Sequence, residues 1–189
     1  MKKYLLFTFL VFQFASSQVK QVIGNLLDAN YYSKEISLFK GKAFVMKEVF
    51  GESKSIIKFE LDPLSSASSG ELTTLAYNCE DLKKEGIVFG FYGDYWNDYG
   101  VIYKGYAFKN LEKKQAIEFL QKLEDAKKEY SKYLNEDLDN NNVYFTYDDL
   151  TILMYKTDRI KFRVFWKTFD AEWGDMSFTR TKLRFEKKI

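Results

Sequence analysis

Apolar and polar residues alternate along most of the chain, and this period of two constrains the fold more than any other feature. The clearest examples are Ile87, Phe89 and Phe91 and, later, Ile160, Phe162, Val164 and Trp166. Successive side chains of a strand point to opposite faces, so this pattern is typical of antiparallel sheets with one solvated face. The expected strands are residues 43–50, 54–61, 71–78, 87–92, 101–108, 142–147, 150–156, 160–168 and 176–186.

One long segment between these strands has helical periodicity instead. Its apolar residues recur at spacings of three and four, which predicts a helix over about 111–134 with Asn110 as its N-cap. Strands, then one helix, then strands is the order of an α+β fold rather than of a βαβ fold. We expect a curved, mostly antiparallel, meander-like sheet with the helix packed on its apolar face. The residues of the helical stripe are Ala116, Leu120, Leu123, Ala126, Tyr130 and Leu134.

The N-terminus has the three parts of a secretory signal peptide. Lys2 and Lys3 are followed by an apolar run from Tyr4 to Phe14 and by small residues up to Ser17. The apolar run is too short to span a bilayer, which takes roughly 20 residues. Residues 1–17 are therefore expected to be a signal peptide and residues 18–189 a single exported domain, periplasmic or extracellular and not an integral membrane protein.

Composition excludes several classes of function. The 29 basic and 27 acidic residues become equal in number once Lys2 and Lys3 are removed, so charge does not favour nucleic acid as a partner. The chain has no histidine and one cysteine, Cys79, so catalytic triads and structural zinc are excluded. No metal or cofactor is expected. A hydrolase that uses only carboxylates remains the one enzymatic alternative.

Residues 90–100, GFYGDYWNDYG, are rich in aromatic side chains where a hairpin connection is expected. Turns need glycine and asparagine but not tyrosine or tryptophan. The aromatic residues either fold back onto the core or form a surface that stacks on a sugar or anchors a protein partner. The candidate binding residues are Tyr92, Asp94, Tyr95, Trp96, Asp98 and Tyr99.

A second candidate site depends on the last two expected strands. If 160–168 and 176–186 form a hairpin, a register that keeps their apolar residues on one face places basic residues opposite one another on the other face. This surface is either an ordinary solvated strand face or a seat for an anionic group. Its residues are Lys161, Arg163, Lys167, Arg180, Lys182 and Arg184.

The sequence thus favours an exported, non-enzymatic binding or interaction protein whose ligand it does not identify. Two alternatives remain open. One is a carrier of an apolar ligand or lipid, with a cavity between helix and sheet. The other is a carbohydrate-binding module that uses the aromatic residues of segment 92–99. An anionic ligand, a carbohydrate and a protein partner are each compatible with the two candidate sites.

The first prediction concerns processing. Ala15 and Ser17 provide the small side chains that a signal peptidase requires, so the mature protein should begin at Gln18. The intact mass of the exported protein measures this directly. A mass that still includes Lys2 and Lys3 would contradict the prediction.

Overall fold

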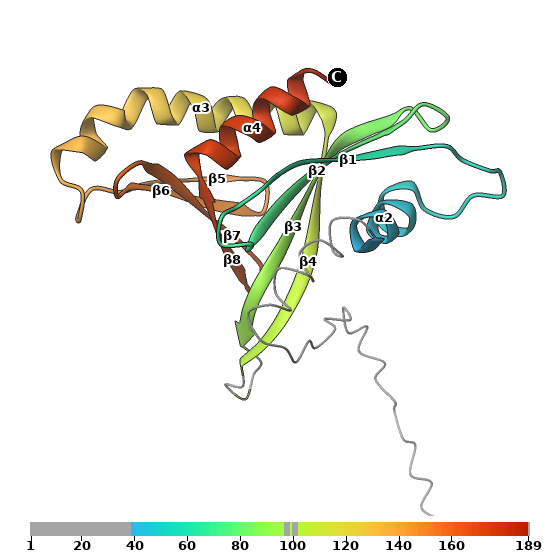
Figure 1. The fold of residues 1–189 in the computed structure, drawn as a ribbon, viewed down its shortest axis with the longest axis horizontal. Coiled ribbons are helices and arrows are strands. Elements are labelled where there is room, and N and C mark those ends of the chain that lie inside the picture. Colours follow the sequence, from blue (N-terminus) through green and yellow to red (C-terminus); the bar gives the residue numbers. More distant parts are fainter. Residues whose placement is uncertain (1–38, 97–98, 100–101, 189) are drawn as a thin grey trace, which may run out of the picture.

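The protein is an α+β fold with two antiparallel sheets (Figure 1). The computed structural model describes residues 39–96, 99 and 102–188, without the side chains of residues 94–96 and 102–104. The predicted signal peptide and its cleavage point before Gln18 lie outside this range. Sheet A contains β1 (Glu60–Ser66), β2 (Leu72–Cys79), β3 (Lys84–Trp96) and β4 (Ile102–Glu112) in that order. Sheet B contains β5 (Val143–Tyr147), β6 (Leu150–Lys156), β7 (Ile160–Trp166) and β8 (Phe169–Gly174) in that order.

The predicted fold class is confirmed, and its antiparallel meanders are real, but the strands divide between two sheets rather than one. The long helix α3 (Lys113–Glu136) follows the last strand of sheet A and precedes the first strand of sheet B. It begins two residues later than expected, because Glu112 and Gln115 form a capping box in place of an Asn110 cap. No helix in the described part of the chain is long and apolar enough to cross a membrane.

One main hydrophobic core joins both sheets to α3. Phe89 of β3, Phe119 of α3 and Trp173 of β8 are each almost completely buried and lie ring to ring. The inward residues of β6 and β7 complete this core. Helix α3 therefore buries its apolar stripe as the sequence predicts, with Phe119 added and with Tyr130 left 38% exposed.

A smaller hydrophobic cluster covers the opposite face of sheet A. Residues 43–50 were expected to form a strand, and that prediction is wrong: they belong to α2 (Gly41–Phe44) and the π-helical η2 (Val45–Phe50). Val45 of η2 is fully buried against Leu75 and Val88 of the sheet. Sheet A is consequently covered on both faces over β2, which explains why nearly every residue of that strand is buried.

The C-terminal segment is also a helix, not the expected strand. Helix α4 (Asp175–Glu186) buries Ser177, Phe178, Thr181 and Phe185, a spacing of three to four that follows one helical face. Asp175 lies in its first turn and a basic residue in its last, an arrangement that the helix dipole favours. The alternation of Met176 with Phe178 resembles a strand, but Met176 is 56% exposed.

Buried hydroxyl groups attach α4 to sheet A. Thr181 lies 2.8 Å from the hydroxyl of Thr74 on β2 and donates to the Ser177 carbonyl, so both buried oxygens are satisfied. The Ser177 hydroxyl donates to the Ser66 carbonyl at 3.0 Å. These bonds fix the helix against β1 and β2, and Figure 1 shows α4 beside α3 above the sheets.

The second prediction tests a close backbone approach in sheet A, at Gly86. A Cβ atom added there would lie 2.3 Å from the Leu111 carbonyl and 2.7 Å from the Tyr77 hydroxyl, so Gly86→Ala should lower the free energy of unfolding by roughly 1–3 kcal/mol. Gly93→Ala on the same strand is the control, since no described atom lies within 4 Å of its Cβ position. Urea denaturation compares them, and equal losses would show that the clash is not real.

Candidate functional site

The aromatic segment lies in a long two-stranded ribbon rather than in a loop. Strand β3 continues to Trp96 and pairs with β4, whereas its pairing with β2 ends at Phe91. The register places Tyr92 opposite Tyr106. The connection is therefore shorter than the sequence indicates, and most of the candidate residues belong to paired strands. Figure 1 shows the ribbon extending beyond the rest of sheet A.

Only part of this candidate site can be placed. Tyr92 is half-buried and Tyr99 is 90% exposed, so the two do not share one environment. Asp98 and the side chains of Asp94, Tyr95 and Trp96 lie outside the described residues. The binding interpretation of this segment accordingly stays a prediction.

The predicted cationic surface does not form. The partner of β7 is β8, joined by a two-residue turn, and not residues 176–186. The expected register is therefore wrong, because residues 169–174, which it leaves as a connection, form strand β8 themselves, with Phe169, Ala171 and Trp173 buried. Strand β8 brings acids beside the bases of β7: Lys161 lies 3.2 Å from Glu172, and Arg163 pairs with Asp170.

The remaining basic residues of that prediction lie on other elements. Lys182 of α4 pairs with Glu124 and Glu186, and Arg184 donates to a backbone carbonyl of β1. Arg180 is exposed on α4, and Lys167 lies over the Trp166 ring in the β7–β8 turn. The basic residues are thus separated and mostly neutralised, so they do not form one anion-binding surface.

A groove lies between α3 and the edge strand β5. It has a volume of about 630 Å³ and is open to solvent. Strand β5 is at the end of the strand order of sheet B, so one of its edges has no neighbouring strand among the residues that the structure describes. We name it the α3–β5 groove; its lining residues are Ile117, Glu118, Gln121, Lys122, Asp125, Ala126, Glu129, Tyr130, Val143, Tyr144 and Phe145.

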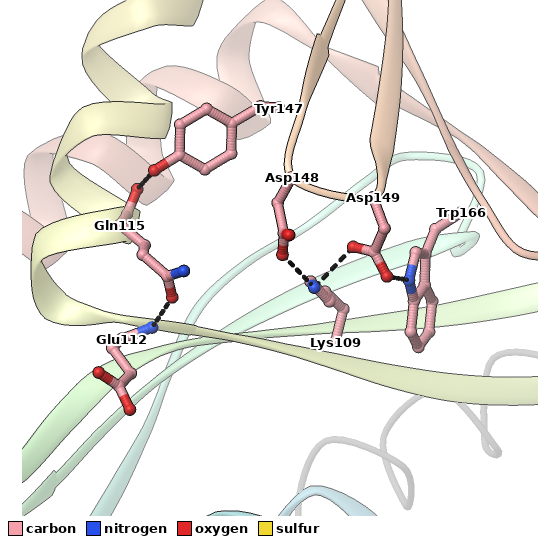
Figure 2. Close-up of polar contacts among 7 residues, drawn as sticks. All are labelled: Lys109, Glu112, Gln115, Tyr147, Asp148, Asp149 and Trp166. Atoms are coloured by element: carbon pink, nitrogen blue, oxygen red, sulfur yellow. Dashed lines mark hydrogen bonds and ion pairs between the residues drawn. The ribbon is translucent and has the colours of Figure 1, made fainter.

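One end of the groove is fixed by contacts of β5 with α3. The Tyr147 hydroxyl, in the last residue of β5, donates to the Gln115 carbonyl at 2.9 Å, and the Gln115 side chain accepts from the Glu112 N–H (Figure 2). Gln115, which takes part in the N-terminal cap of α3, thus also holds β5 against the helix. At the other end, the Asn141 side chain donates to the Tyr133 carbonyl at 2.7 Å. Strand and helix are held together at both ends, which leaves the groove between them.

The turn between β5 and β6 is held by a charged cluster. Lys109 of β4 lies 2.6 Å from both Asp148 and Asp149, and the indole N–H of Trp166 donates to Asp149 at 2.8 Å (Figure 2). The cluster connects sheet A to sheet B beside the core. The Asp148 backbone is in the left-handed region, with φ of 54°, as this tight turn requires.

Ion pairing shifts the pKa values of Lys109 and Asp149 in the directions expected for contacts that favour the folded state. Burial alone would lower the pKa of Lys109, but Asp148 and Asp149 outweigh it and the pKa is raised. Burial would raise the pKa of Asp149, but Lys109 and Trp166 outweigh it and the pKa is lowered. The Asp149 contribution is present above the pKa of the unfolded carboxyl, about 4, and is lost as the pH falls through the lower folded value. The Lys109 contribution is lost only as the pH rises above about 10.

The middle of the groove contains one side chain that covers the strand edge. Lys122 of α3 donates to the Thr146 carbonyl at 3.0 Å and lies 4.9 Å from the centre of the Phe145 ring. The i,i+4 spacing of Glu118 and Lys122 on the helix would favour an ion pair between them, but Lys122 turns to the strand instead. Lysines that shield exposed strand edges are a known protection against unwanted pairing. The edge is therefore covered by a flexible side chain and not by a packed element.

Comparison of the chain with protein-family models, curated proteins and solved structures gives no significant match.

The third prediction tests the charged cluster. Lys109→Met leaves two adjacent carboxylates without their cation, and should lower the free energy of unfolding by about 1–2 kcal/mol at neutral pH, less than for a fully buried pair because both carboxylates are half exposed. The loss should shrink as the pH falls below about 4 and through the lowered pKa of Asp149, because protonation of Asp149 removes its ion pair with Lys109. Urea denaturation at both pH values measures it. Lys114→Met, which alters a 90% exposed lysine, is the control; an equal loss there would contradict the role of the cluster.

Proposed function

We propose that the protein is exported and acts as a non-enzymatic binding protein, and that its ligand site is the α3–β5 groove. The observation that carries this proposal is the coincidence of an apolar groove with an unpaired strand edge. The groove offers contact for side chains, and the edge offers backbone hydrogen bonds. Together they suit a polypeptide ligand.

Exposed apolar side chains around the groove support this proposal. Tyr144 is 75% exposed, Ile117 42% and Tyr130 38%. Scattered exposed apolar residues are ordinary, but a group that shares one groove is typical of a binding surface. Tyrosine is also favoured at protein interfaces, since its ring adds apolar contact and its hydroxyl adds a hydrogen bond.

The groove favours a polypeptide over an apolar small molecule. A lipid carrier needs an enclosed space between helix and sheet, and the centre of that interface is filled by core residues such as Phe119 and Leu123. The space that remains is an open groove at the margin of the sheet, and acids lie along its rim. A ligand there keeps contact with water, as a bound protein segment does.

The β3–β4 ribbon supports a second candidate function, carbohydrate binding. The exposed Tyr99 ring lies at the tip of a ribbon that extends beyond the sheet. An aromatic face can cover the apolar side of a sugar while nearby carboxylates bind its hydroxyl groups. The two candidates use opposite parts of the molecule, so one set of variants separates them.

The fourth prediction tests the groove as the ligand site. Ile117→Glu places a charge in the groove without altering the buried core, and should abolish retention of the ligand that copurifies with the exported protein. Leu183→Glu is the matched control, because Leu183 is 54% exposed on a helix outside the groove. Both variants should keep their stability within about 0.5 kcal/mol.

Mass spectrometry of the copurified material gives the measurement. A polypeptide retained by the wild type and by Leu183→Glu, but not by Ile117→Glu, supports the proposal. Retention of the same species by Ile117→Glu would exclude the groove as the ligand site. If that species is a saccharide lost only from Tyr99→Ala, the ribbon is the binding site instead.

A further inference from the structure

We infer that the groove binds a partner by strand addition: an extended, basic and apolar segment of another protein pairs with the free edge of β5 and displaces Lys122. This inference rests on the proposed function and specifies the partner and its mode of binding. It follows from four properties of the groove, namely its backbone groups, its removable cover, its length and its charge.

The backbone groups that face the groove can be identified from the hairpin. A two-residue turn makes the pair that closes it, Tyr147 and Leu150, hydrogen-bonded, and such pairs alternate along an antiparallel ladder. Val143 and Phe145 therefore bond to β6, while the N–H and C=O groups of Tyr144 and Thr146 point away from the sheet. The bond from Lys122 to the Thr146 carbonyl confirms this direction.

Lys122 is the only cover of these groups among the residues that the structure describes. Its ammonium group donates to the Thr146 carbonyl, whereas no described residue forms a hydrogen bond with the outward backbone groups of Tyr144. A lysine side chain leaves such a position at little cost, because its ammonium group is readily hydrated. An incoming backbone N–H can take its place on the Thr146 carbonyl.

The dimensions fit a short strand. Strand β5 contains five residues, which corresponds to about 17 Å of edge. The contacts at Tyr147 and Asn141 limit the groove at each end. A partner strand of similar length would lie under α3, with its inward side chains against Ile117, Ala126 and Tyr130.

The charge of the lining favours a basic segment. Three acids line the groove, Glu118, Asp125 and Glu129, against one base, Lys122. Asp125 accepts a hydrogen bond from the neutral Gln121 amide, and Glu118 accepts one from the Tyr147 hydroxyl. The Lys114 ammonium group makes only a long ion pair of 3.9 Å with Glu118. Lysine and arginine side chains of a partner strand can rest their aliphatic parts on the apolar lining and reach these carboxylates.

The test uses the folded protein and two synthetic peptides with acetylated and amidated ends. The first is Lys-Val-Lys-Val-Lys-Val-Lys, and the second replaces each lysine with glutamate. We expect the lysine peptide to bind more tightly, by about tenfold or more at low salt, and this preference should weaken as salt is added. On binding, the amide protons of Tyr144 and Thr146 should be protected from exchange with solvent, as measured by NMR.

Substitution of Lys122, the side chain that covers the edge of β5, provides an independent readout. Lys122→Ala should bind the lysine peptide about three- to tenfold more tightly, because no side chain has to be displaced. Lys132→Ala is the control, since Lys132 is exposed on α3 outside the groove. N-methylation of the peptide amides that face β5 should abolish binding to the wild type and to Lys122→Ala.

Three results would overturn the inference. Peptide binding lost in Ile117→Glu but without protection of Tyr144 and Thr146 would show that the groove binds side chains and not a strand; the proposed function would then stand. Absence of lysine-peptide binding even to Lys122→Ala would exclude a basic strand. Protection of the same amides in peptide-free protein, rising with protein concentration, would show that the partner is a second copy of this chain.

Discussion

The contacts of one buried tryptophan hold the two sheets and two helices together. The ring centre of Trp173 lies 5.6 Å from that of Phe89 in sheet A, 6.5 Å from that of Phe119 in α3 and 5.4 Å from that of Phe178 in α4. Edge-to-face geometry adds to the free energy that burial of these large rings provides. The groove depends on this arrangement, because the same core sets the distance between α3 and sheet B.

Much of the fold could be predicted from the sequence, and each failure has a physical cause. The long helix and strands β5, β6 and β7 follow simple periodicities, since each has one buried face. Strand β8 alternates in the same way, but its six residues also fit a connection between two longer expected strands, and it is missed for that reason. Helix α4 was missed because half of its buried face consists of Ser177 and Thr181, which a count of apolar residues does not include. Helix α2 and η2 were missed because they bury only two residues completely, Gly41 and Val45, too few to show a period. The division into two sheets depends on contacts between segments, which the residue pattern of a single segment does not show.

The groove could not be predicted, although some of its residues could. The aromatic residues of β5 and the acids of α3 are visible in the sequence, but their juxtaposition depends on Tyr147 reaching Gln115 across more than thirty residues. The role of Lys122 was hidden for the same reason, because helical spacing pairs it with Glu118 while the structure directs it to Thr146. Local patterns identify elements, and tertiary contacts decide which of their surfaces remain free.

The hydroxyl bonds of α4 have a consequence for the order of folding. Each sheet pairs only neighbouring strands, so most backbone pairing is local in the sequence and can form early. Thr74 and Thr181, however, are separated by 107 positions, and α4 comes last in the chain. The main core therefore stays incomplete until the twelve-residue helix α4 packs against β1 and β2. Strand pairing within the sheets is not enough to bury Phe178 and Phe185, so the docking of α4 is expected to be a late, long-range step of folding.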